Sequence, residues 1–317
     1  MEKKKRLITI LALTIILPLI VIYGVGYLAA HKALHVPHQP LLKTPAEYNG
    51  LKYENISFQS TDGIPLKGWW IPGESSAVIF IIHGYGATRA GWLGKNIKGE
   101  EEYIDWLASA PVLNKAGFNL VYFDLRACGE SGGDMITLGK YETNDLMGAI
   151  NWVLDNKKQN NGRKFSGIGL IGMSMGGNVS LRGAIEIKKL PIEKAAVISI
   201  GAYRFDTMID KSIRFWTSLP GFFIPIIKQM SGFILGFNPS EEIDPSRYAS
   251  KISPIPVMFI QAEKDEIGDV KDAQAIYQSA VQPKELIIIP DAPRFKAYRY
   301  PAENPKKIVS FFSKYLL

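Results

Sequence analysis

Residues 168–176 read Ile-Gly-Leu-Ile-Gly-Met-Ser-Met-Gly, and this stretch decides the fold class of the chain. The apolar run Ile168–Ile171 predicts a strand, and the stretch Asn178–Lys189 predicts a helix that ends before Pro191. Between them lies the pattern G-x-S-x-G, in the strand, turn and helix context that raises such a match above chance. Glycines flank Ser174 because larger side chains there would collide with the strand and the helix. The stretch therefore predicts a serine held at a tight, exposed turn.

Apolar, β-branched runs recur along the chain and predict strands buried on both faces: Ala77–Ile82, Leu120–Phe123, Ile168–Ile171, Ala195–Ile200, Val257–Ile260 and Leu286–Ile289. Helices are expected between and after them: Tyr103–Ala116, Leu146–Asn156, Asn178–Lys189, Val270–Ala280 and Pro305–Tyr315. A hairpin of Leu51–Phe58 and Leu66–Ile71 precedes them, with its turn at Thr61-Asp62-Gly63. The alternation predicts an α/β fold with a mainly parallel, doubly wound sheet and flanking helices. Ligands are expected at the carboxyl ends of the strands.

One region, residues 203–238, is rich in aromatic residues and breaks this alternation. We expect an inserted helical cap over about residues 203–245. An apolar cap excludes water from a site and accepts acyl or aromatic groups. A helical excursion packed on the domain, or a face resting on lipid, fits the same composition equally well.

The N-terminal region predicts a membrane anchor. Residues 7–30 carry no charge and are long enough to cross a bilayer. The basic residues 3–6 precede them, which predicts a cytoplasmic N-terminus and a domain outside the cell membrane. We therefore expect a tail and transmembrane anchor over residues 1–30, an extended stalk over 31–49 and one domain over 50–317. A cleaved signal peptide is the alternative, since small residues are available near its end.

Composition excludes several other functions. The net charge of +7 comes from 37 Lys and Arg against 30 Asp and Glu, but no basic stripe interleaved with aromatics indicates nucleic-acid binding. The single cysteine, Cys128, excludes an intrachain disulfide. His31, His35 and His38 lack Cys, Asp or Glu partners at ligand spacing and are interpreted as solvated linker residues. We expect no metal and no cofactor.

Four motifs in order resemble the α/β-hydrolase superfamily, and more closely its membrane-anchored bacterial serine-hydrolase and esterase-like members. The motifs are His83-Gly84-Tyr85-Gly86, Asp124-Leu125-Arg126 with Gly129-Glu130-Ser131-Gly132-Gly133, Gly172-Met173-Ser174-Met175-Gly176, and Gln261-Ala262-Glu263-Lys264-Asp265. The resemblance covers about residues 50–317. It implies an α/β-hydrolase fold and carboxylic-ester, acyl or short peptide-like substrates.

The resemblance also implies roles for individual residues. Ser174 is the expected nucleophile, and Asp265 is the expected acid of the triad. The backbone N–H groups of Tyr85 and Met175 are the expected oxyanion donors. The second G-x-S-x-G match, residues 129–133, is interpreted as a structural loop because no helix-forming run follows it. Cys128, directly before that loop, is interpreted as an apolar filler rather than a reactive thiol.

The histidine that such a triad needs is missing, because no histidine follows His83. Arg294 occupies the matching place after the last predicted strand, and arginine cannot accept a proton at working pH. We expect it to pair with Asp265. Loss of the base typically costs about six orders of magnitude in turnover, roughly 8 kcal/mol. His83 and Lys296 stay open as replacement bases.

Two functions therefore remain open. The first is an anchored serine hydrolase with an atypical or impaired triad. The second is a catalytically inactive α/β-hydrolase-fold protein that binds ligands or scaffolds a partner. The fold alone does not separate them, since function resides in the site.

Overall fold

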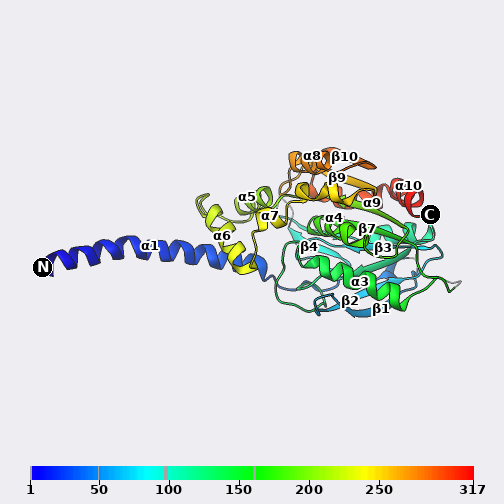
Figure 1. Ribbon diagram of the computed structural model, residues 1–317, viewed down its shortest axis with the longest axis horizontal. Coiled ribbons are helices and arrows are strands. Elements are labelled where there is room, and N and C mark those ends of the chain that lie inside the picture. Colours follow the sequence, from blue (N-terminus) through cyan, green and yellow to red (C-terminus); the bar gives the residue numbers. More distant parts are fainter. Residues whose placement is uncertain (1, 49, 96–98, 160–161) are drawn as a thin grey trace.

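A computed structural model describes residues 2–48, 50–95, 99–159 and 162–317, and shows a central sheet with helices on both faces (Figure 1). The strands run in the order β1-β2-β6-β3-β7-β8-β9-β10. Their bounds are β1 Glu54–Gln59, β2 Pro65–Ile71, β3 Ala77–Ile82, β6 Asn119–Phe123, β7 Gly167–Met173, β8 Lys194–Ile200, β9 Val257–Lys264 and β10 Lys284–Pro293. The pairs from β6 through β3 to β10 are parallel, while β1 and β2 pair antiparallel. The predicted hairpin and the mainly parallel sheet are confirmed.

The helices form two layers and a cap. They are α1 Glu2–Leu34, α2 Ala110–Lys115, α3 Glu142–Asn156, α4 Met175–Ile187, α5 Phe205–Trp216, α6 Phe223–Leu235, α7 Pro239–Glu242, α8 Val270–Ser279, α9 Arg294–Glu303 and α10 Pro305–Leu316. Alternate residues of each buried strand face opposite layers. Thus Val78 and Phe80 share a core with α3, α4 and α8, whereas Ile79 and Ile81 share one with α2, α9 and α10. The expected helical cap corresponds to α5, α6 and α7, between β8 and β9.

The predicted helix Tyr103–Ala116 is wrong in its first half. Residues Glu101–Asp105 form β5, which pairs antiparallel with β4, Gly91–Lys95. The helix α2 begins only at Ala110, with Pro111 in its first turn. A proline fits there but would break a helix that had started at residue 103.

The structure differs from the sequence-based predictions at two further places, both near the C-terminal end. The strand predicted as buried at Leu286–Ile289 belongs to β10, an edge strand whose side chains there are half-buried. An edge strand has a neighbour on one side only, so one row of the strand remains accessible. The helix α9 was not predicted, and it carries Pro301 in its interior, a residue that argues against a helix in any sequence pattern.

The first helix extends well beyond the domain (Figure 1). Residues Leu13–Leu34 are long and apolar enough to cross a membrane. Residues 31–34 continue this helix, and the following segment lies against the domain, since His38 Nδ1 contacts the Gly129 carbonyl at 2.9 Å and Lys43 pairs with Asp105. The arrangement differs from an extended stalk because these polar contacts hold the segment on the domain surface.

Candidate active site

The turn at Ser174 joins β7 to α4 in a strained conformation. Ser174 has φ 54° and ψ −116°, a region that side-chain-bearing residues rarely adopt. A Cβ atom at Gly172 would lie 2.0 Å from the Gly176 carbonyl oxygen, and one at Gly176 would lie 2.1 Å from that of Ile82. Both glycines are therefore required, and the serine oxygen is presented where β7 ends.

The two predicted oxyanion donors lie on the segments that flank Ser174. Met175 is the first residue of α4, so its N–H has no carbonyl one turn earlier to bond. The loop after β3 packs on the turn, because a Cβ atom at Gly84 would lie 3.2 Å from Ser174 Cβ. Tyr85 is the next residue of this loop and lines the same cavity as Ser174. The segments that carry the two predicted oxyanion donors therefore both lie beside Ser174.

Asp265 follows the buried part of β9 and is itself buried. Its carboxylate accepts hydrogen bonds from the backbone N–H groups of Ile267 and Gly268, both at 2.8 Å, and from Gln261 Nε2 at 2.9 Å. Arg294 Nη1 donates to both carboxylate oxygens, at 2.6 and 2.8 Å. Burial raises the pKa of Asp265, but the Arg294 cation and the amide donors outweigh burial and hold the pKa below its usual value. Asp265 is therefore an anion at neutral pH.

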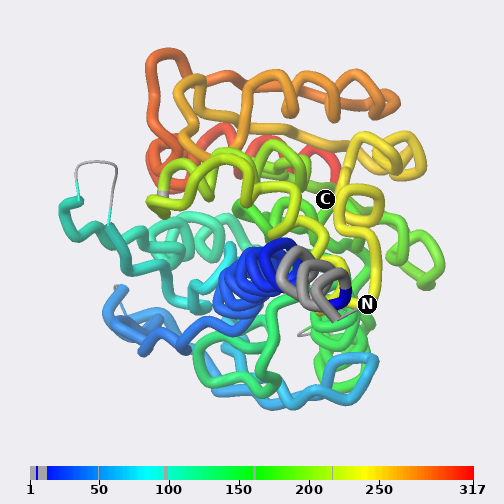
Figure 2. Tube along the Cα trace, turned by 90° about the vertical axis from the view of Figure 1, so that its left-hand side faces the viewer, coloured from blue at the N-terminus to red at the C-terminus, as the bar shows by residue number. Residues whose placement is uncertain are grey.

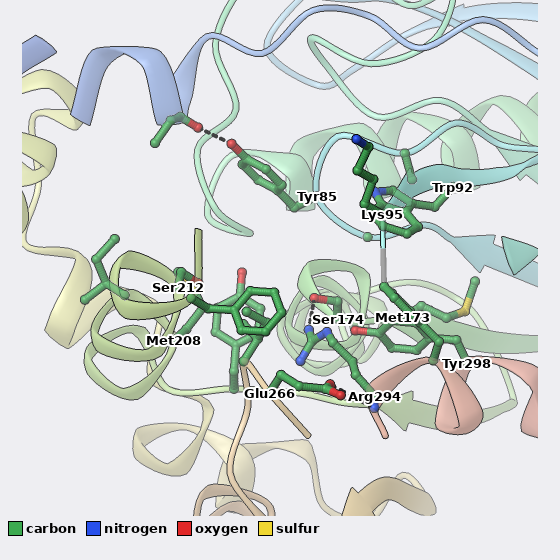
Figure 3. A pocket seen from close by; sticks show the side chains of 18 of the residues that line it. Tyr85, Trp92, Lys95, Met173, Ser174, Met208, Ser212, Glu266, Arg294 and Tyr298 are labelled. Carbon is green, nitrogen blue, oxygen red and sulfur yellow. Dashed lines mark hydrogen bonds between the residues drawn. The ribbon is translucent and has the colours of Figure 1, made fainter. Parts of the chain in front are cut away.

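The Arg294 guanidinium bridges Asp265 and Ser174. Figure 3 shows the half of this bridge that reaches Ser174. Arg294 Nη2 donates to Ser174 Oγ at 2.6 Å while Nη1 holds the carboxylate. The side chain is nearly inaccessible to solvent. Burial alone lowers the pKa of Arg294, but the facing carboxylate of Asp265 raises it above the already high value of a free arginine. A permanent cation thus stands between the two residues, where a triad has an imidazole.

The two alternative bases are engaged elsewhere. His83 is buried, its Nε2 accepts from the Leu125 N–H at 2.9 Å, and its Nδ1 contacts the Gly84 carbonyl at 2.7 Å. Burial lowers the pKa of His83, and the ring holds two loops together. Lys296 lies at the cavity edge, with its Nζ 2.8 Å from Glu303 and about half of its side chain exposed.

Tyr298 is a site residue that the sequence did not single out. Its ring centroid lies 5.2 Å from Arg294 Cζ, and the side chain lines the cavity beside Ser174 (Figure 3). Burial raises the pKa of Tyr298, so its hydroxyl stays protonated beside Ser174. The sequence does carry a signal for Tyr298: it lies four residues after Arg294, and residues four apart share one face of a helix. That helix, α9, was itself not predicted.

The cavity over Ser174 has a volume of about 730 Å³. One end is apolar and is lined by α1 and the cap: Ala33, Leu34, Met208, Ile213 and Ile227. The other end carries charged side chains: Lys95, Glu102, Lys296 and Arg299. Such a volume lies in the range typical of small-molecule sites. Within the described ranges no group of three or more His, Cys, Asp or Glu side chains could hold a metal ion.

The loop at Gly129–Gly133 has the structural role expected from its sequence. Ser131 Oγ donates to the Asp124 carbonyl at 2.7 Å and accepts from the Lys67 N–H at 3.0 Å. Cys128 is buried, and burial raises the pKa of its thiol. A protonated, inaccessible thiol packs as an apolar side chain.

The chain resembles several known proteins in sequence. It is 29% identical to the protein YfhR of Salmonella typhi over 265 residues, which are 80% of this chain and 77% of that protein. It is 25% identical to the protein YqkD of Bacillus subtilis over 263 residues, 80% of this chain and 76% of that protein.

Solved structures show the same fold. An esterase of Pyrococcus furiosus superposes with a TM-score of 0.69 and 24% identity, over 90% of this chain and 99% of that one. A dienelactone hydrolase of Anabaena variabilis superposes with a TM-score of 0.54 and 18% identity, over 84% and 99%. The fold is therefore that of the α/β hydrolases.

A family model covers more than half of the chain. The model described as X-Pro dipeptidyl-peptidase (S15 family) matches residues 39–206. This range contains the loop after β3, the strands β6 and β7, and the turn at Ser174. The chain therefore belongs to the X-Pro dipeptidyl-peptidase (S15) family, within the α/β-hydrolase superfamily.

Proposed function

We propose that this protein is a membrane-anchored α/β-hydrolase that binds carboxylic esters with an apolar acyl part, and that Arg294 strongly impairs their hydrolysis. One observation carries the proposal: the Arg294 guanidinium donates to Ser174 Oγ and to Asp265 at the same time. The triad is complete in geometry, but its central member cannot accept a proton.

The impairment concerns the first chemical step. Ser174 Oγ attacks the ester carbonyl carbon, and the hydroxyl proton must leave as the new C–O bond forms. An imidazole would take this proton, whereas the guanidinium only donates. The proton must then pass to water, while the oxyanion still receives the N–H groups of Tyr85 and Met175. When the base of a triad is lost, the oxyanion donors still accelerate ester hydrolysis about a thousandfold over the reaction in water.

The cavity supports the substrate class. The part of its wall that α1 and the cap supply comes largely from alanine, leucine, isoleucine and methionine side chains. Apolar walls stabilise an acyl chain by about 25 cal/mol per Å² of apolar surface removed from water. Short X-Pro peptides, the substrates that the family description names, are the alternative.

The anchor belongs to the same proposal. The apolar helix Leu13–Leu34 supports a single membrane crossing, and the basic residues before it favour a cytoplasmic N-terminus. The domain then lies outside the cell membrane. A catalytically inactive binding or scaffolding protein is the second candidate, and the same Arg294 contact favours it if turnover is absent altogether.

The test is hydrolysis of p-nitrophenyl butyrate by the full-length protein in nanodiscs. We compare the parent with Ser174→Ala and Arg294→His, and with Lys296→His as a matched control on the same helix. We expect slow hydrolysis in the parent, none in Ser174→Ala, a gain of about a hundredfold or more in Arg294→His from a restored general base, and no gain in Lys296→His.

Each other outcome has a meaning. An ordinary turnover of about 1–1000 s⁻¹ in the parent, lost in Ser174→Ala, would show that Arg294 does not impair catalysis. A parent as slow as Ser174→Ala, with ligand binding retained, would favour the binding protein. Faster cleavage of glycyl-prolyl-p-nitroanilide than of the ester would correct the substrate class.

A further inference from the structure

We propose that the acyl chain bound in this cavity comes directly from the bilayer, along the wall that α1 and the cap helices share, so that the substrate is a membrane lipid. The inference rests on the proposed function, because it names the substrate class of the same site. Four features carry it: the α1 wall, the contact between α1 and Tyr85, the position of α6, and the polarity of the cavity.

The membrane helix is itself part of the cavity wall. Ala29, Ala33 and Leu34 line the cavity together with Ser174, and they are the last residues of the apolar stretch Leu13–Leu34. Earlier residues of the same helix expose their apolar side chains, as Leu28 does with 67% of its surface. Apolar side chains of α1 thus lie both on its exposed part and in the cavity wall, although the exposed His31 and Lys32 also lie in its last turn.

A hydrogen bond ties α1 to the predicted oxyanion loop. Tyr85 Oη donates to the carbonyl oxygen of Ala33 at 2.5 Å (Figure 3). Ala33 lies in the last turn of α1, where helix carbonyls have no partner within the helix. Since the Tyr85 N–H is also an expected oxyanion donor, a single residue connects the end of the membrane helix with the place where the ester carbonyl would bind.

The cap helix α6 lies at the depth of the lipid. It packs directly on α1, since a Cβ atom at Gly26 would lie 2.5 Å from Ile226 Cγ2, and Figure 2 shows the two side by side. Gly26 precedes Leu34 by about 12 Å of helix axis at about 1.5 Å per residue. The contact is thus well inside the apolar stretch. A helix packed there must sit among headgroups and upper acyl chains.

Exposed aromatics on α6 fit the same position. Phe222 and Phe233 expose 57% and 75% of their surfaces. Eleven residues are about three turns of helix, so both lie on one face. Helices that lie in a membrane interface carry Phe, Trp and Leu side chains on the face that enters the lipid. Because this face continues the lipid-exposed surface of α1, we assign it to the bilayer rather than to a protein partner.

The cavity has one apolar end and one charged end, which match the acyl chain and the headgroup of a lipid. Ser174 lies between Met208 and Ser212 on the cap side and Trp92 and Lys95 on the other (Figure 3). The residues of α1 belong to the apolar end, and Lys95 of the charged end lies on the opposite side of Ser174 from the cap. An acyl chain entering along α1 would place its ester carbonyl at Ser174 and its polar headgroup among the charged side chains.

The test uses full-length protein in phosphatidylcholine vesicles that contain a small fraction of phosphatidylcholine with a photoactivatable diazirine in its acyl chain. Crosslinked residues are mapped by mass spectrometry after illumination. We expect crosslinks at Met208, Ile213 or Ile227 inside the cavity, as well as on the exposed face of α1. The crosslinks on α1 serve as the internal reference.

Cavity-filling variants make the test specific. Ser212→Trp fills the cavity from the cap, and Ala33→Leu fills it from α1. Each should lower the cavity crosslinks about tenfold or more relative to those on α1, because a filled cavity has no room for the chain. Ser57→Trp, the same substitution as Ser212→Trp but at an exposed position of β1 outside the cavity, should leave them unchanged. Thermal melts show whether each variant is folded, and two independent fillings keep one misfolded variant from deciding the result.

Failure of this inference can be told from failure of the proposed function. Crosslinks confined to the exposed faces of α1 and α6 overturn lipid entry. If p-nitrophenyl butyrate is then still hydrolysed by Arg294→His, the hydrolase site stands and takes soluble esters. Absence of both cavity crosslinks and ester hydrolysis overturns the proposed function as well.

Discussion

Arg294 combines two roles that are usually separate. As a cation it balances the buried carboxylate of Asp265, and as a donor it occupies the oxygen of Ser174. In a Ser-His-Asp triad the serine hydroxyl donates to the imidazole, whereas here Arg294 donates to Ser174 Oγ, so the donor is reversed and no proton acceptor is present. The site residues therefore stay in place for a physical reason that does not depend on catalysis: without Arg294, a buried charge would be left unpaired.

Removing that cation should destabilise the protein. We expect Arg294→Met to lower the free energy of unfolding by about 3 kcal/mol, because breaking a buried ion pair leaves an uncompensated charge. Lys296→Met, which breaks an exposed pair with Glu303, should cost about 1 kcal/mol or less. Urea titrations in detergent, followed by tryptophan fluorescence, measure both. Equal stability of the two variants would show that the amide donors alone satisfy Asp265.

The Asp265 carboxylate should also give the protein an acid-sensitive component of stability. Because the folded-state pKa lies below its usual value of about 3.9, the ionised form stabilises the folded state above that pH. This contribution is lost as the pH falls through the folded-state pKa. In Asp265→Asn no such ionisation exists. We therefore expect the gap in unfolding free energy between parent and variant to narrow from pH 6 to pH 3. A constant gap would contradict the lowered pKa.

At the scale of elements, the contact between α1 and α6 joins the proposed membrane anchor to the cap. The two helices approach so closely because position 26 is glycine. Gly24, two residues earlier on the same helix, has no atom within 4 Å of a Cβ built there. The same substitution can therefore be made at both glycines of α1: at Gly26 it meets α6, and at Gly24 it meets no neighbouring atom.

Gly26→Leu should therefore separate the cap from the anchor, and Gly24→Leu should not. Hydrogen exchange of full-length protein in nanodiscs is the measurement. We expect faster exchange in the amides of α6 for Gly26→Leu, because packing on α1 protects this helix from local opening. Unchanged exchange in Gly26→Leu would mean that the side chain of Ile226 moves aside without loosening α6.

At the scale of the whole molecule, α1 and the domain form an elongated body, with α1 extending along its long axis (Figure 1). The cavity lies where the two meet, since α1 and the cap both line it. The proposed orientation places the charged end of the cavity away from the membrane. Separation of the anchor from the domain would open one wall of the site.

Topology makes a prediction at this scale. With the N-terminus in the cytoplasm, protease added to intact spheroplasts should digest the domain over residues 50–317. An N-terminal tag should remain protected until the membrane is permeabilised. A domain protected in intact spheroplasts would reverse the proposed orientation. A mature protein whose mass lacks residues 1–30 would identify the first helix as a cleaved signal peptide.

The sequence by itself determined the sheet and the turn at Ser174. The continuous apolar runs of β3, β6, β7 and β9 are buried on both faces, as their composition predicts, whereas the run in the edge strand β10 is half-buried. The glycines at 172 and 176 are required by close contacts with atoms a few residues away or after the adjacent strand. Such local constraints can be read from spacing alone. The absence of a histidine after His83 likewise needs no structure.

Only the tertiary structure decided what surrounds that turn. The bridge from Asp265 through Arg294 to Ser174 joins segments far apart in the chain, and its distances depend on how β9 and β10 pair. Tyr298 joins the site through α9, a helix whose internal proline hides it from sequence patterns. The α1 wall depends on close packing against α6. Contacts between distant segments arise from the summed packing of the whole chain, which no single stretch of sequence encodes.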